Sequence, residues 1–83
     1  MKFKAQINIM PREELLDPQG KATQHGLASM GFSSLSRLRI GKRIAIELEA
    51  PSKPDAEKIV KEACEKLLVN QIMEQFEFVV NEN

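Results

Sequence analysis

The sequence is poor in the residues that stabilise small domains through covalent bonds or metals. Its 83 residues include one cysteine, Cys64, and one histidine, His25. A single cysteine cannot form an intramolecular disulfide, and one Cys with one His is too few for a zinc site. A core of this size supplies only about 3–5 kcal/mol, so small natural chains often add disulfides, metals or oligomerisation. We therefore expect this chain to self-associate.

Long apolar runs and a net charge are also missing. No apolar run approaches the roughly 18 residues that cross a bilayer, and no basic-then-apolar leader precedes the first strand-like segment. We therefore expect a cytoplasmic protein without a membrane partner. The apolar share of 42% and the charged share of 29% are typical of a folded globular protein, and the length allows a single domain over residues 1–83.

The zero net charge conceals an uneven distribution. Residues 1–43 carry a net charge of +5, and residues 44–83 carry −5. Oppositely charged regions can guide association between chains. A chain with both signs on its surface is suited to pairing with a second copy or with larger subunits, whereas a strongly basic nucleic-acid binder is excluded.

The first half of the chain predicts one strand, one helix and two further strands. Met1–Met10 alternates apolar and polar residues, which indicates a half-buried strand. A helix is expected from the Asp17-Pro18 cap to Gly31. Residues 35–40 and 44–50 are expected as strands joined by a three-residue loop, residues 41–43. This hairpin would place Arg37 opposite Glu47.

The second half predicts one more helix and one more strand. A Ser52-x-x-Asp55 cap precedes a helical stripe of apolar residues between Ala56 and Leu68, and residues 75–80 alternate again. The order is β-α-β-β-α-β. The predicted fold is therefore α+β, a two-layer structure of ferredoxin-like topology, in which two helices cover one face of a four-stranded, mainly antiparallel sheet.

No motif supports catalysis. His25 lies on a helix weakened by glycine and is expected to be solvated or capping, and Cys64 lies in an apolar stripe and is expected in the core. The isolated Gly20 and Gly41 match no phosphate-binding loop. RNA-recognition modules share the predicted order of elements, but their sheets carry aromatic platforms, and the predicted outward faces here have none.

One long motif resembles a known family. The residues from Leu15 to His25 read LLDPQGKATQH and resemble the PurS family of phosphoribosylformylglycinamidine (FGAM) synthase subunits. The likeness covers nearly the whole chain, and Gly26 departs from it where alanine is expected. Three further segments carry the resemblance: Met30-Gly31-Phe32, Arg39-Ile40-Gly41-Lys42 and Cys64-Glu65-Lys66-Leu67-Leu68-Val69-Asn70.

The resemblance implies a noncatalytic subunit in the fourth step of de novo purine synthesis. It implies a homodimer or higher homo-oligomer that bridges a glutaminase subunit and a synthetase subunit. ATP and Mg²⁺ would act in the synthetase, and this chain would bind no cofactor of its own. The alternative is a small ferredoxin-like regulatory or nucleic-acid-binding domain.

Two segments are candidate partner-binding sites. A helix start presents unpaired N–H donors, and glycines permit a close approach of another backbone. The competing interpretation is a capped turn that serves the monomer alone. The candidate residues are Asp17, Pro18, Gln19, Gly20, Arg39, Gly41, Lys42 and Arg43.

Overall fold

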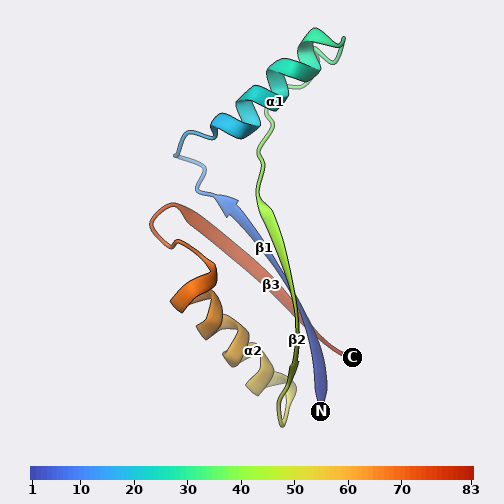
Figure 1. Cartoon of the computed structure of the whole chain (residues 1–83), viewed down its shortest axis with the longest axis vertical. Coiled ribbons are helices and arrows are strands. Elements are labelled where there is room, and N and C mark those ends of the chain that lie inside the picture. Colours follow the sequence, from blue (N-terminus) through green and yellow to red (C-terminus); the bar gives the residue numbers. More distant parts are fainter.

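The computed structural model describes residues 1–83 and shows an elongated molecule of 51 × 26 × 14 Å (Figure 1). The order of elements is β-α-β-α-β, with a π-helical turn after the second helix. No helix is long and apolar enough to span a membrane. The elements are β1 (Lys2–Pro11), α1 (Pro18–Ser29), β2 (Lys42–Glu49), α2 (Lys53–Ala63), η1 (Cys64–Leu68) and β3 (Glu74–Glu82).

The sheet has three strands in the order β2-β1-β3, and β1 is antiparallel to both neighbours. Ile7 lies opposite Ile44 on one side and opposite Phe78 on the other, so apolar residues of all three strands share one face. The alternation predicted for the first strand is confirmed, because Phe3, Ala5, Ile7 and Ile9 are buried. The opposite face of the sheet is polar and open.

Helix α2 covers the apolar face of the sheet. The Ser52 hydroxyl accepts a hydrogen bond from the Asp55 N–H at 3.4 Å, which confirms the predicted cap. The buried residues Ala56, Val60 and Cys64 pack into one core with β1 and Val80. The helix lies mainly over β3 and β1 (Figure 1). Ile44, Ile46 and Leu48 on β2 are consequently only half-buried.

The predicted strand over residues 35–40 does not form within the single chain. Residues 33–41 run beyond the sheet and lead directly into β2, so residues 41–43 do not form a hairpin loop (Figure 1). The partner of β2 is β1, whose Ile7 and Ala5 face Ile44 and Ile46. This pairing satisfies the apolar alternation of β2 as well as the predicted hairpin would, so the pattern could not identify the partner strand. The predicted pairing of Arg37 with Glu47 is therefore wrong.

Helix α1 does not lie on the sheet, contrary to the two-helix face that the pattern predicted. It projects from one end of the molecule and packs against residues 35–40, which we call the return segment (Figure 1). Gly20 is its only buried residue, and no residue of α1 belongs to the core. We call residues 18–40 the arm, and the three strands with α2 and η1 the body. Both chain termini lie at the opposite end of the molecule, where the Asn83 N–H donates to the Lys2 carbonyl at 2.9 Å.

Candidate partner-binding site

The eight candidate residues gather where the arm meets the body. We call this junction the neck. It consists of residues 12–17 and of residues 35–41, which include the part of the arm that leads back to β2 (Figure 1). The sequence predicted these segments as a helix start and a hairpin loop and did not place them relative to each other. The structure brings them together as the two sides of the neck.

Asp17 holds the two sides of the neck together. One carboxylate oxygen accepts the N–H of Gly20 at 3.0 Å and so caps α1. The other accepts the N–H of Ile40 at 2.9 Å, across the neck. These two backbone hydrogen bonds, together with the Arg39 guanidinium, hold the pKa of Asp17 below its usual value, although burial acts in the opposite direction. Asp17 is thus an internal anchor with only 8% of its surface exposed.

Arg39 joins the same anchor from the return side of the arm. Its Nε lies 3.7 Å from the Asp17 carboxylate. The guanidinium donates to three carbonyl oxygens: Pro11 at 3.1 Å, Arg12 at 2.9 Å and Glu13 at 3.2 Å. A planar guanidinium with five donors suits this task, whereas an ammonium could not span all three acceptors. Arg39 is therefore engaged within the chain.

Gly20 and Gly41 permit close contacts at the neck, Gly20 with the two sides of the neck and Gly41 with the end of β1. A Cβ at Gly20 would overlap the Asp17 carboxylate and the Leu38 carbonyl oxygen. A Cβ at Gly41 would overlap the Ile9 carbonyl oxygen and the Met10 sulfur. The sequence left open whether the arm glycines serve packing or admit a partner. Gly20 serves packing within the chain, against the Leu38 carbonyl of the return segment.

The side chains of the other four candidates are exposed on the surface next to the neck. Pro18, Gln19, Lys42 and Arg43 are exposed, and Lys42 forms an ion pair with Glu74 at 3.4 Å. Gln19 and Lys42 line a shallow hollow of about 240 Å³ that lies across the neck. The remaining lining residues are Pro11, Asp17, Ile40, Gly41 and Glu74.

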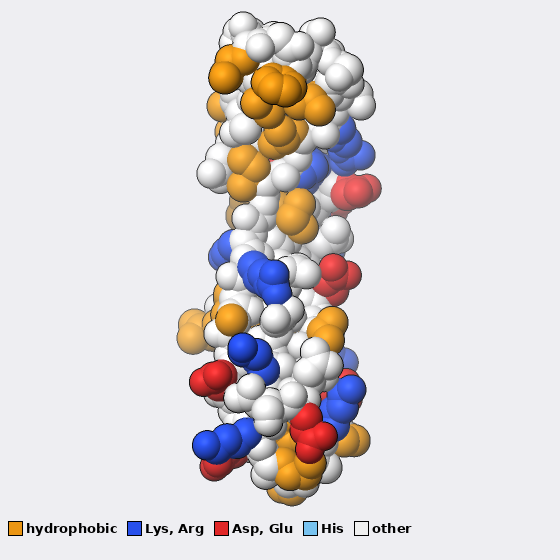
Figure 2. Space-filling model, turned by 90° about the vertical axis from the view of Figure 1, so that its right-hand side faces the viewer, with side chains coloured by type: hydrophobic (Ala, Val, Ile, Leu, Met, Phe, Trp, Pro, Cys, Tyr) orange, Lys and Arg blue, Asp and Glu red, His pale blue; other side chains and the backbone are white.

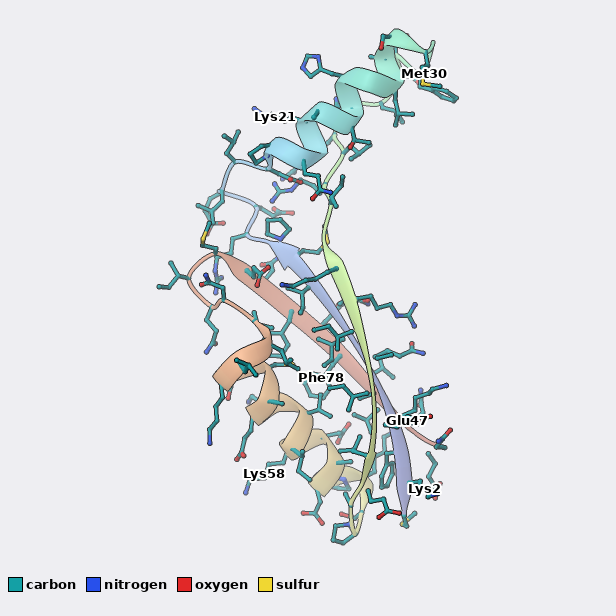
Figure 3. The ribbon with its side chains drawn as sticks, viewed as in Figure 1. Lys2, Lys21, Met30, Glu47, Lys58 and Phe78 are labelled. Atoms are coloured by element: carbon teal, nitrogen blue, oxygen red, sulfur yellow. The ribbon has the colours of Figure 1, made fainter.

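The tip of the arm carries apolar side chains that the sequence prediction did not place in a site. Met30 is 74% exposed and Phe32 is 55% exposed, and Leu35 nearby is also exposed. Figure 2 shows apolar side chains gathered over this end of the molecule. Figure 3 places Met30 far from the sheet, whereas Phe78 points into the space between the sheet and α2. The sequence could have indicated this exposure, because these apolar residues belong to no amphipathic stripe that would bury them.

The structure places the His25 and Cys64 side chains as the sequence predicted. His25 is exposed on the arm. Cys64 is buried in the core, and burial raises the pKa of its thiol. No group of three His, Cys, Asp or Glu side chains is placed to hold a metal ion. The phenylalanines of β3 stack on each other on the covered face of the sheet, with ring centroids 6.3 Å apart, so they provide no base-stacking platform on the open face.

The family model for PurS, described as phosphoribosylformylglycinamidine (FGAM) synthase, matches residues 4–82. The chain belongs to the PurS family. The phosphoribosylformylglycinamidine synthase subunit PurS of Bacillus subtilis (strain 168) is 39% identical over 80 residues, which cover 96% of this chain and 94% of that protein.

Solved PurS structures share the fold. A chain in the structure of PurLQS from Thermotoga maritima is 37% identical, with a TM-score of 0.91 over 98% of this chain and 99% of that chain. Bacillus subtilis PurS in its C2 crystal form is 40% identical, with a TM-score of 0.86 over 96% and 99% of the two chains. Because these high scores extend over nearly the full length, the PurS fold includes the arm as well as the body.

Two of the four segments that carry the PurS resemblance meet at the neck. The run from Leu15 to His25 supplies Asp17 and Gly20, and the run from Arg39 to Lys42 supplies the other side of the anchor. In this PurS chain the two motifs therefore meet in space although 13 residues, 26–38, separate them in sequence. The motifs form the base of a projecting arm, which is an arrangement suited to protein–protein contact.

Proposed function

We propose that this chain is the small, noncatalytic subunit of FGAM synthase. In this role it brings a glutaminase subunit and an ATP-using synthetase subunit together, so that ammonia from glutamine converts formylglycinamide ribonucleotide to its amidine. Membership of the PurS family and the likeness to PurLQS support the proposal. ATP and Mg²⁺ act in the synthetase. We also propose a cytoplasmic location for this subunit.

The arm is the observation that carries this proposal. It contributes nothing to the core of its own chain and exposes Met30 and Phe32 at its tip. Exposed apolar groups that gather on one surface mark interaction sites. The body offers a complementary surface, because Ile44, Ile46 and Leu48 are only half covered. A two-fold dimer would cover both surfaces at once, with each arm on the body of the other copy.

The return segment supports the same dimer. Residues 35–40 alternate in the way that predicted a strand, yet none of their backbone groups takes part in a backbone–backbone hydrogen bond. The outer edge of β2 is also unpaired, because β1 is its only neighbour. We propose that this segment becomes the fourth strand of the sheet in the dimer. The second copy would then supply the second helix over the apolar face.

The neck divides the candidate residues into two roles within this proposal. Asp17, Gly20, Arg39 and Gly41 shape the neck from inside. Pro18, Gln19, Lys42 and Arg43 present side chains to the larger subunits. A Gln19→Ala, Lys42→Ala double variant is expected to fold and dimerise but to lower glutamine-dependent turnover. Full glutamine-dependent turnover by this variant would show that the Gln19 and Lys42 side chains are not needed for contact with the larger subunits.

One reconstitution tests the function itself. The synthetase and glutaminase subunits are mixed with and without this chain, and ATP consumption is followed with glutamine as the nitrogen source. We expect glutamine-dependent turnover only when the chain is present. Ammonia supplied directly to the synthetase serves as the control, because it bypasses the glutaminase. Equal glutamine-dependent rates with and without the chain would overturn the proposal.

A further inference from the structure

The arm is joined to the body through the neck alone. The two sides of the neck contain no strand, and no backbone–backbone hydrogen bond joins residues 12–17 to residues 35–41. Two connections of this kind would let the arm swing relative to the sheet. Its direction must therefore be set by side chains.

Two side chains make nearly all the polar connections across the neck. Asp17 accepts the Ile40 N–H at 2.9 Å, and Arg39 donates to the carbonyls of Pro11, Arg12 and Glu13 at 2.9–3.2 Å. Asp17 and Arg39 also form an ion pair with each other, at 3.7 Å. The only other connection is an exposed ion pair between Arg37 and Glu13 at 4.0 Å. We call Asp17 and Arg39 the neck clamp.

The neck clamp is also fastened to the body. Arg12, whose carbonyl accepts from Arg39, donates through two guanidinium nitrogens to the Gln71 carbonyl at 3.1 and 2.6 Å. Its backbone N–H donates to the Met73 carbonyl at 2.9 Å. The turn between η1 and β3 therefore supports the side of the neck that the clamp holds. The connection runs without a break from the body to the start of α1.

We propose that Asp17 and Arg39 are positioning residues that fix the direction of the arm, so that it is already oriented when a second copy binds. This inference rests on the proposed function, in which the arm is the dimer contact. A flexible arm would have to be ordered on binding, which lowers affinity, whereas an oriented arm avoids that loss. The side chains of the clamp are largely covered, so they act on the arm and do not contact the partner directly.

Spin labels measure the direction of the arm directly. Ser33 at the arm tip and Lys58 on α2 are exposed and can be replaced by cysteine for labelling, whereas buried Cys64 stays unlabelled. The measurement uses a Met30→Ser, Phe32→Ser background, which we expect to be monomeric and which sedimentation checks first. We expect a narrow distance distribution in this background and a clearly broader one after Asp17→Asn or Arg39→Lys. Glu13→Gln, which breaks only the exposed ion pair, is the matched control and should leave the distribution narrow.

Sedimentation of the chain with its native arm tip measures the consequence for dimerisation. Asp17→Asn and Arg39→Lys should each raise the dimer dissociation constant about tenfold, and Glu13→Gln should change it less than twofold. Amide exchange in β1 should stay at the parent rate, because a purely structural role would loosen the body as well. If Asp17→Asn does not fold, Arg39→Lys alone tests the inference through the distance distribution and the dimer dissociation constant.

Two results would overturn this inference. One is a distance distribution that stays equally narrow in the clamp variants, and the other is a broadened distribution with unchanged dimer affinity. A native chain that sediments as a monomer would instead contradict the proposed dimer. The distance measurement would still report on the clamp, so the two failures can be told apart.

Discussion

The body and the arm differ in how much of their apolar surface and backbone is satisfied within the single chain. The body buries the alternating apolar residues of β1 beneath α2 and completes its own core. The arm has a helix whose only buried residue is a glycine and a return segment without backbone–backbone hydrogen bonds. The body is therefore stabilised within one chain, whereas the arm needs a second molecule. Variants in the two regions should therefore affect different properties of the protein.

The largest difference between the two regions is expected in the free energy of unfolding, when a side chain is truncated in each. Ile7→Ala removes a fully buried side chain from the centre of the sheet and should lower the free energy of unfolding by about 2–5 kcal/mol. Met30→Ala at the arm tip should change the unfolding of a monomeric sample by less than about 0.5 kcal/mol. Urea denaturation followed by circular dichroism measures both. Equal losses would mean that the arm belongs to the core.

Removing an apolar side chain from the arm tip should affect association instead of folding. Phe32→Ser is expected to raise the dimer dissociation constant about 10- to 100-fold, because aromatic anchors dominate binding energy. Sedimentation equilibrium is the measurement. Val79→Ser is the matched control, since Val79 is similarly exposed, at 57%, but lies on the open polar face of the sheet. A similar loss in both variants would argue against a contact specific to the arm.

The two glycines of α1 should respond to alanine in opposite directions. At Gly26 an added Cβ meets nothing within 4 Å, so Gly26→Ala should stabilise the helix by up to about 1 kcal/mol. Gly20→Ala should destabilise the chain by about 1–3 kcal/mol, because the Cβ overlaps Asp17 and the Leu38 carbonyl. Thermal unfolding of the two variants checks the sign. Stabilisation by both would show that the neck can relax around a side chain.

The smallest expected effect is a loosening of the neck in acid. The pKa of Asp17 is lowered by the Gly20 and Ile40 N–H groups, so its contribution to stability is present above the ordinary aspartate pKa of about 3.9. The contribution is lost as the pH falls through the lowered value. Amide exchange at Gly20 and Ile40, corrected for the intrinsic effect of pH, should therefore accelerate below about pH 4. The Asp17→Asn variant should lack this transition, and an unchanged transition in it would assign the effect to another group.

The sequence predicted the body well because local patterns determine it. The alternation in β1, the apolar stripe of α2 and the Ser52 cap each encode one element, and all three are confirmed. The family could also be recognised, because the motif around Asp17-Pro18-Gln19-Gly20 is long and specific.

The arm was harder to predict because its partner lies outside the local sequence. Residues 35–40 have the alternation of a strand, but a strand also needs a neighbour, and β2 pairs with β1 instead. The sequence named two segments as a candidate partner-binding site, and both lie at or next to the neck. The pattern could not show that Asp17 and Arg39 turn inward to each other, since a contact between residues 22 positions apart depends on the path of the neck.

The meeting of the two chain ends has a practical consequence for protein engineering. Since Asn83 and Lys2 are hydrogen-bonded at the end away from the arm, a short linker could join the termini with little disturbance of the sheet. New ends could then be opened at Gly31, an exposed glycine with a φ of 101° at the arm tip. Such a circular permutant would keep the body continuous while turning the arm into two free tails.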